Sequence, residues 1–342
     1  MLLQRFKDVA EEATWSAISF EIQPRQNSES NLMSAIQSHG ERLKESTSIA
    51  YKARSIAKGA ADVARSTVRV SYEGFEWSLA GDLEPQTAEL GEMLADLTQF
   101  VVQHGRKGLA LLLDEAQILT DEKGSSGNHA LSTLVAAVST LQKAQVPVVV
   151  VLCGLPTLAV NLLNARTYSE RMFQGFTVGS LPPEAAEEAF VRPLESSAIS
   201  ADPALVASVL DEVEGYPYFI QLWGAELWDT AHDAGLSAMD EAVLSVTRDR
   251  VFRRLDSDFY EPRIDSLTPA EQDLLIDAAR CAYPPLMVSD LNGQSPKSPG
   301  NVNVLLGRLV KANVIFRRQK GQYEYTAPGF VDFLQRYSSR QN

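Results

Sequence analysis

The sequence predicts an α/β protein with a parallel sheet in its first half, followed by an all-helical region and a small domain of helices and a hairpin. Residues 109–113 and 148–153 are apolar at every position, and a helical pattern separates them. Runs that are apolar on both faces are typical of parallel strands buried between helices. From Pro182 onward the pattern is helical. We therefore expect three domains, at residues 1–180, 181–264 and 265–342.

The composition is that of a globular chain. Its 342 residues are 45% hydrophobic and 22% charged, which excludes a disordered or fibrous protein. The longest apolar run, residues 148–153, is far below the roughly 20 residues of a membrane helix. The first eight residues carry charge where a signal peptide needs an apolar stretch, so we expect a cytoplasmic protein with no membrane partner.

Cysteine and histidine usage predicts neither a disulfide framework nor a zinc site. Cys153 and Cys281 lie in segments that we expect to belong to separate domains, which favours reduced thiols. The four histidines have no short metal-ligand spacing with each other or with either cysteine.

The first residues predict a helix followed directly by a strand. Apolar residues recur at helical spacing from Leu2, and residues 15–20 alternate as a half-buried strand does. Residues 31–64 read as a long helix, and residues 68–77 as a β-like segment with a turn at Glu73-Gly74. We expect residues of about 31–85 to be an insertion into the α/β domain.

The core strands follow this insertion. A helix over about 86–103 leads into the strand 109–113, and a helix over about 129–144 leads into the strand 148–153. A short strand is expected near 176–178.

Proline and aspartate mark the helices of the second domain. Helices are expected to begin at Pro182-Pro183 and at Asp202-Pro203. The break at Gly215-Tyr216-Pro217 precedes a helix over about 218–234, and Ser237 with Asp240 can cap a further helix that runs to about residue 260.

The last domain has the order of a winged helix. Thr268 and Glu271 form a capping box with proline at the first helical position. Helices over about 268–281, 287–292 and 301–312, and a hairpin of 314–318 and 322–326, follow in order. From Leu267 onward there are nine Lys/Arg and six Asp/Glu, whereas the whole chain has a net charge of −13.

Two adjacent carboxylates end the first core strand. Asp114 and Glu115 follow the apolar residues 109–113 directly. Ligands bind outside the carboxyl ends of parallel strands, where an aspartate can hold Mg²⁺ and a neighbouring glutamate can orient water. The spacing suits a Walker B motif, and the alternative is a buried strand that meets a solvated acidic helix start.

The order of these features resembles that of P-loop ATPases of the AAA+/STAND group, close to bacterial and archaeal ATPases with an initiator-like helical lid and a C-terminal winged helix. The resemblance covers nearly the whole chain. It rests on LLLDEAQ at 111–117, GLP at 154–156, YSER at 168–171, GYP at 215–217 and LTPAE at 267–271. It implies a nucleotide-binding molecular switch that binds and hydrolyses ATP with Mg²⁺.

The resemblance also implies roles for individual residues. Asp114 would bind Mg²⁺, Glu115 would polarise the attacking water, and Arg171 would be an arginine finger or sensor. Gly215, Tyr216 and Pro217 would lie beside the adenine. The alternatives are a surface salt bridge for Arg171 and a plain interhelix turn for residues 215–217.

The phosphate-binding loop of this family is missing from the sequence. No G-x-x-x-x-G-K-[ST] motif, whose backbone N–H groups cradle phosphates, occurs in the 342 residues. Arg106-Lys107-Gly108 precedes a strand and Lys123-Gly124-Ser125 follows the acidic pair, so neither has the strand–loop–helix context.

In the family this loop and a central strand precede a helix like the one at Leu2, so the resemblance implies that the chain starts one strand too late. We expect negligible ATP binding, and ATPase activity only if a Walker A segment is restored. Even then hydrolysis is open, because Cys153-Gly154 stands where a polar sensor is usual. Strands 15–20, 109–113 and 148–153 should pair in parallel, with 176–178 unpaired or shifted across the gap. The open sheet edge should favour self-association.

Six basic residues of the last domain can contact nucleic acid. Lys297, Arg308 and Lys311 could line a recognition helix, and Arg317, Arg318 and Lys320 a wing. Winged helices also pack against proteins. A second class of function therefore stays open: a nucleotide-free scaffold or DNA-binding regulator that acts through the winged helix on DNA, another protein or a second copy.

Overall fold

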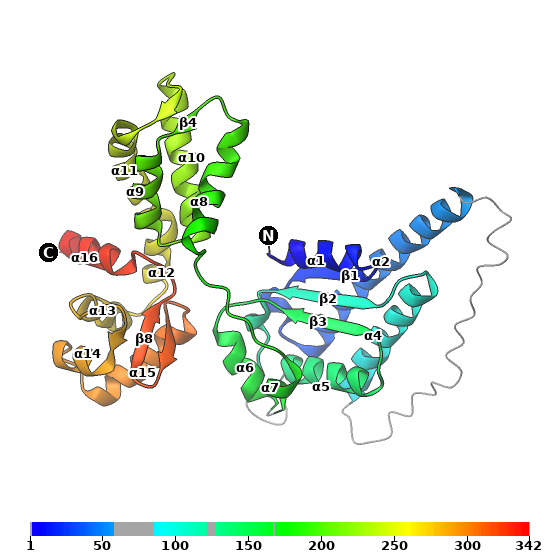
Figure 1. The fold of residues 1–342 in the computed structure, drawn as a ribbon. Helices are drawn as coiled ribbons and strands as arrows, with labels where there is room; N and C mark the ends of the chain where they lie inside the picture. Colours follow the sequence, from blue (N-terminus) through cyan, green and yellow to red (C-terminus); the bar gives the residue numbers. More distant parts are fainter. Residues whose placement is uncertain (1, 58–84, 122–127, 167, 342) are drawn as a thin grey trace. The chain divides into compact units, whose positions relative to one another are not determined.

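The chain divides after Gly175 into two units, residues 1–175 and 176–342, in a computed structural model that describes residues 2–57, 85–121, 128–166 and 168–341 (Figure 1). The β-like segment expected at 68–77, most of the second half of the expected insertion, and Lys123-Gly124-Ser125 lie outside the described residues. The expected boundary at 265 falls within the second unit, where a separate winged-helix domain stays a prediction.

Three parallel strands form the sheet of the first unit. Their order is β1 (Ser16–Glu21), β2 (Leu109–Asp114) and β3 (Val148–Leu152), with β2 in the middle. This confirms the expected parallel pairing. The helix α5 (Ala130–Lys143) connects β2 to β3, as a parallel crossover requires.

Helices cover both faces of this sheet. The helix α1 (Leu2–Glu12) packs on one face, where its Leu3 clusters with Ala110 and Leu112 of β2 (Figure 1). The other face packs against α2 (Glu29–Ala57), α4 (Pro85–Gln103) and α5. The first five residues of β2 are therefore all buried, which explains why this run is apolar at every position.

The helix α1 runs antiparallel to the strands. Only residues 13–15 separate its end from the start of β1, so the chain must turn back along the sheet. The N-terminal turn of α1 consequently lies at the edge where the strands have their carboxyl ends (Figure 1).

The strand expected near 176–178 does not form. Phe176 is 79% exposed and Val178 is 74% exposed, and neither pairs with a strand of the described chain. Of the two outcomes that the sequence left open, the structure has the unpaired one. A strand needs a neighbour that accepts its backbone hydrogen bonds, and local propensity does not supply one. The helices α6 (Thr157–Ala165) and α7 (Ser169–Met172) precede this segment.

Helices dominate the second unit, largely as predicted. The prolines begin α8 (Pro183–Val191), α9 (Pro203–Val213) and α10 (Pro217–Asp233). The side chain of Asp240 accepts hydrogen bonds from two backbone N–H groups of α11 (Glu241–Leu255), so Asp240 is its cap and Ser237 is not. Two short segments, β4 (Ser200–Ala201) and β5 (Ala238–Met239), pair in parallel and were not expected.

A π-helix interrupts the end of this helical region. The helix α11 continues into η4 (Asp256–Tyr260) and then α12 (Glu261–Asp265), where the sequence predicts one α-helix to about residue 260. The buried Tyr260 of η4 donates a hydrogen bond to the carbonyl of Pro328 at 2.6 Å. Residues on both sides of position 265 thus belong to one hydrophobic core.

The last elements follow the predicted order. Thr268 and Glu271 form the expected capping box at α13 (Pro269–Ala278). The strands β6 (Leu286–Met287), β7 (Ile315–Gln319) and β8 (Gln322–Tyr325) make an antiparallel sheet in the order β6-β8-β7. Two helices, α14 (Val288–Gln294) and α15 (Pro299–Lys311), lie between β6 and β7, and the sequence analysis missed the terminal α16 (Phe330–Gln341).

Candidate functional site

The predicted acidic pair lies at the carboxyl edge of the first unit's sheet. Asp114 ends the middle strand and is exposed, whereas Leu109–Leu113 before it are buried. Strand side chains alternate, so Asp114 shares the α1 face with Ala110 and Leu112. In the register of the sheet, Asp114 is next to Glu21 of β1, a carboxylate to which the sequence analysis gave no role.

Backbone geometry holds the acidic pair at this edge. The amide of Glu115 donates a hydrogen bond to Oδ1 of Asp114 at 3.0 Å. Glu115 has a φ of +51°, in the left-handed region that residues other than glycine rarely adopt. Such strained residues persist where the surroundings fix them, and they occur often at functional sites. The chain therefore turns at Glu115 instead of continuing the extended strand.

Gln117 fixes the carboxylate of Glu115 and ties it to the end of the neighbouring strand. Its Nε2 donates to Oε2 of Glu115 at 2.6 Å, and its Oε1 accepts from the backbone N–H of Leu155 at 3.1 Å. Its backbone carbonyl accepts from the amide of Asn161 at 2.9 Å. The sequence indicates Gln117 only as part of LLLDEAQ at 111–117, because its contact with Leu155 joins residues 38 positions apart.

Gly154 leaves the space that the Gln117 side chain occupies. A Cβ at this position would lie 2.3 Å from Oε1 of Gln117 and 3.1 Å from its backbone nitrogen. The backbone N–H of Ala116 donates to the carbonyl of Cys153 at 2.9 Å and joins the same two strand ends. These contacts make a rigid platform beneath the acidic pair.

Cys153 directly follows the last residue of β3, where the resemblance described above leads us to expect a polar sensor. Burial raises the pKa of its thiol, and the negative charge of Asp114 raises it further. Neither Cys153 nor Cys281 is in a disulfide. A neutral thiol is a weak hydrogen-bond donor, so this position cannot hold a phosphate oxygen as an asparagine or threonine does.

The residues at this edge fit Mg²⁺ only as a partial site. Over the described parts of the chain, no group of three or more His, Cys, Asp or Glu is placed to hold a metal ion. Mg²⁺ commonly takes one or two carboxylates and fills its other positions with water and substrate phosphates. Asp114 fits this pattern as a single carboxylate ligand, provided that phosphate groups are held nearby.

Arg171 lies on the exposed side of α7. Its neighbours Tyr168 and Met172 pack against the core of the first unit. Within the described residues, its guanidinium makes no ion pair, including none with Asp114 or Glu115. The alternative, a surface salt bridge, is thus not formed with any described residue, and the role of arginine finger or sensor stays a prediction.

The turn at residues 215–217 belongs to the second unit. Gly215 has a φ of +69°, and a Cβ there would lie 2.3 Å from the carbonyl oxygen of Leu181. The carbonyl of Gly215 accepts a hydrogen bond from the amide of Leu181 at 2.8 Å. The ring of Tyr216 packs on Phe219 with 4.9 Å between centroids. These contacts account for the turn structurally, and its role at an adenine is untested.

Ion pairs engage half of the basic residues that could contact nucleic acid. Lys297 pairs with Asp273 at 3.5 Å, Arg308 with Glu271 at 4.0 Å, and Arg318 with Glu324. The other three are exposed and make no ion pair within the described chain: Lys311, Arg317 and Lys320.

Comparisons with known proteins show which proteins have a similar sequence or fold. A domain of unknown function, DUF8462, matches residues 257–334. The Walker-type ATPase PABY2304 of Pyrococcus abyssi is similar in structure, with a TM-score of 0.53 and 17% identity over 93% of this chain and 84% of that chain. RuvB, the Holliday junction branch migration motor of Thermotoga maritima, has a TM-score of 0.37 and 13% identity, over 72% of this chain and 83% of that chain. A comparison with curated protein sequences gives no match.

The chain therefore has a mixed α/β, helix-rich fold with a small parallel sheet that resembles P-loop ATPases. None of the described helices is long and apolar enough to cross a membrane.

Proposed function

We propose that this protein is an ATP-dependent molecular switch of the AAA+/STAND type. The observation that carries the proposal is the placement of Asp114 and Glu115 at the carboxyl end of a buried middle strand, in a chain similar over 93% of its length to a Walker-type ATPase. In parallel α/β sheets, ligands bind outside the carboxyl ends of the strands.

The two carboxylates have different roles in this proposal. Asp114 is exposed and has one oxygen held by the amide of Glu115, so its other oxygen can bind Mg²⁺. Bound Mg²⁺ supplies positive charge to the phosphates of the nucleotide. Glu115 polarises the attacking water, and Gln117 fixes the orientation of its carboxylate through the 2.6 Å hydrogen bond. Arg171 senses or stabilises the γ-phosphate, and residues 215–217 contact the adenine.

The sequence has no recognisable loop that would bind the phosphates of ATP at this site. The 342 residues contain no G-x-x-x-x-G-K-[ST] motif, so most charge-assisted contacts to the β- and γ-phosphates are lacking. Two features favour the addition of a strand and a phosphate loop: the outer edge of β3 has no paired strand in the described structure, and the N-terminal turn of α1 lies at the same sheet edge as Asp114. Helix N-termini favour phosphate groups.

Calorimetry with ATP and Mg²⁺ tests the proposal. Residues 1–342 should bind ATP negligibly, and a form with a strand and phosphate loop joined ahead of Leu2 should bind it. In that form, Glu115→Gln should keep binding and lose turnover. Glu12→Gln, on the exposed surface of α1, is the control and should change neither. Equal turnover by wild type and Glu115→Gln would remove Glu115 from its role, and micromolar ATP binding by residues 1–342 would refute the missing-loop argument.

A second candidate function is a nucleotide-free scaffold or DNA-binding regulator. It is favoured by the order of elements from α13 to β8, which is that of a winged helix, and by three exposed cations without an ion pair in the described chain, Lys311, Arg317 and Lys320. If the form with an added loop still fails to bind ATP and the 342 residues bind duplex DNA, this second function is the better one.

A further inference from the structure

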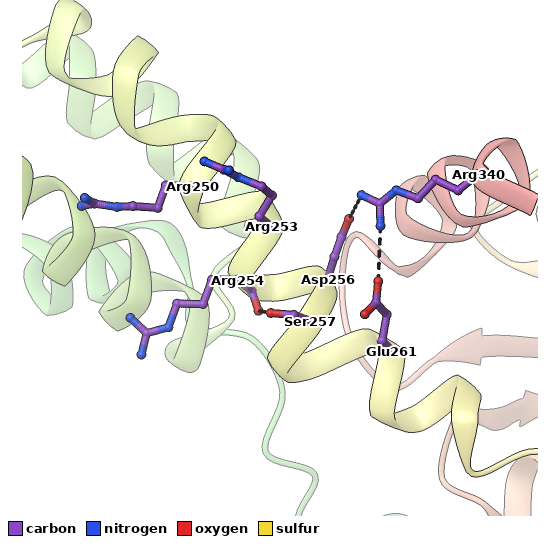
Figure 2. A pocket seen from close by; sticks show the side chains of 7 residues that line it. All are labelled: Arg250, Arg253, Arg254, Asp256, Ser257, Glu261 and Arg340. Carbon is purple, nitrogen blue, oxygen red and sulfur yellow. Dashed lines mark hydrogen bonds and ion pairs between the residues drawn. The ribbon is translucent and has the colours of Figure 1, made fainter.

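An open cavity of about 640 Å³ lies on the second unit where α11, η4 and α16 meet (Figure 2). Its lining contains no aromatic or aliphatic side chain. The lining residues are Arg250, Arg253, Arg254, Asp256, Ser257, Glu261 and Arg340. The polar groups that this lining can offer to a ligand are therefore guanidinium, carboxylate and hydroxyl groups.

Two buried carboxylates hold the arginines around this cavity. Glu226 of α10, with a side chain 8% exposed, pairs with both Arg250 and Arg254. Asp256 of η4, 3% exposed, pairs with both Arg336 and Arg340, the latter at 3.1 Å. Each carboxylate thus fixes two guanidinium groups of one other helix, Glu226 those of α11 and Asp256 those of α16.

The carboxylates and the arginines of this cluster differ in their exposure to solvent. Both carboxylates are buried, whereas the side chains of Arg250, Arg254 and Arg340 are 45%, 52% and 52% exposed. A guanidinium has five N–H donors, and the buried carboxylates do not use all of them. One terminal nitrogen of Arg250 donates instead to the backbone carbonyl of Glu226 and to the hydroxyl of Thr230, both at 2.8 Å. Two further carboxylates pair with these arginines, Asp258 at 3.5 Å from Arg254 and Glu261 at 3.3 Å from Arg340. With Arg253, the cluster contains five arginines and four carboxylates, which are Arg250, Arg253, Arg254, Arg336 and Arg340, and Glu226, Asp256, Asp258 and Glu261.

Arg253 differs from its neighbours. Its Nε donates to the backbone carbonyl of Asp249 at 3.2 Å, and no carboxylate of the described residues pairs with it. The two terminal nitrogens of its guanidinium are therefore available to a ligand. Figure 2 shows Arg253 on α11 and Arg340 on α16, on the two sides of the cavity.

We propose that this cavity binds a ligand with two neighbouring phosphate groups, such as free pyrophosphate or the backbone of a nucleic acid. The planar guanidinium fork matches phosphate oxygens in pairs, and the buried carboxylates keep the forks in place before the ligand arrives. The cavity is larger than a single phosphate requires. The site lies in the second unit and does not depend on Asp114 or on a phosphate loop.

Titration of the full chain with pyrophosphate at low salt tests the proposal by calorimetry. Wild type should bind, and Arg253→Gln should bind at least ~10-fold more weakly with an unchanged melting temperature, because Arg253 supports no carboxylate. The control is Arg192→Gln, at the exposed residue that directly follows α8, where the arginine pairs with Glu188 at 3.2 Å, and it should bind as wild type does. Arg253→Lys keeps the charge and loses the fork, so it should fall between the two. No binding by wild type, or equal binding by wild type and Arg253→Gln, would overturn the proposal.

A short DNA duplex distinguishes the two sources of phosphate. If the ligand is a nucleic-acid backbone, pyrophosphate competes with the duplex and Arg253→Gln weakens both. If it is a free anion, Arg253→Gln weakens pyrophosphate binding alone. Asp114→Asn should leave both titrations unchanged, so that failure of this proposal and failure of the proposed ATPase site are separate results.

Discussion

Gly154→Ala should weaken the first unit by displacing the side chain of Gln117. The new Cβ would lie 2.3 Å from Oε1 of Gln117, closer than any real contact, so this amide must turn away. It then loses its hydrogen bonds with the N–H of Leu155 and with Glu115. Each bond contributes about 0.5–1.5 kcal/mol, and water replaces part of it at this accessible edge, so we expect a loss of about 1–2 kcal/mol. In a unit of this size that corresponds to about 2–8 °C in Tm.

Scanning calorimetry on wild type, Gly154→Ala, Gln117→Ala and the double variant measures this effect. If the cost arises mainly from the Gln117 side chain, Gly154→Ala should cost less in the Gln117→Ala background than in wild type, where only the 3.1 Å contact with the backbone nitrogen of residue 117 and the 3.3 Å contact with that of Ala116 remain. The control is Gly91→Ala in α4, where no atom lies within 4 Å of the new Cβ, and it should stabilise by up to about 1 kcal/mol. A full cost of Gly154→Ala in the absence of the Gln117 side chain would refute the reasoning.

Three further predictions concern the hairpin, the capping box and the sheet edge. If the hairpin contacts DNA phosphates, Arg317→Ala with Arg318→Ala should weaken binding of all duplexes and reduce the slope of log K against log salt by about 1–2; an unchanged slope would exclude these contacts. Hydrogen bonds from the amide and hydroxyl of Thr268 lower the pKa of Glu271 below its ordinary value of 4.5. The ionised carboxylate thus stabilises the fold above pH 4.5, and this stabilisation is lost as the pH falls below that value. In urea unfolding at a series of pH values, the free energy of unfolding of Glu271→Gln should therefore fall less steeply below pH 4.5 than that of wild type. An equally steep fall would contradict this prediction. Val149 is 46% exposed on the outer strand β3, and Val149→Lys should reduce self-association in sedimentation velocity, whereas equal association would place the contact elsewhere.

Local patterns in the sequence determine most elements of this protein. The uninterrupted apolar run of β2 predicts a strand buried on both faces, because any polar side chain there would lose its hydration. Proline and aspartate set the starts of α9 and α11 through caps that involve only neighbouring residues. The Thr268 capping box is local in the same way. The acidic pair is also recognisable, because Asp114 and Glu115 directly follow the apolar run.

Contacts between distant residues determine the rest, and only the tertiary structure shows them. Residues 176–178 have the composition of a strand, but no strand of the described chain accepts their hydrogen bonds, so they stay unpaired. Gln117 reaches Leu155 only because parallel pairing places the ends of β2 and β3 side by side. Arg340 meets Asp256 across 84 positions of the chain, because packing of α16 on η4 brings them together. Such pairs form only when the whole fold is stable, so they cannot be predicted from a window of neighbouring residues.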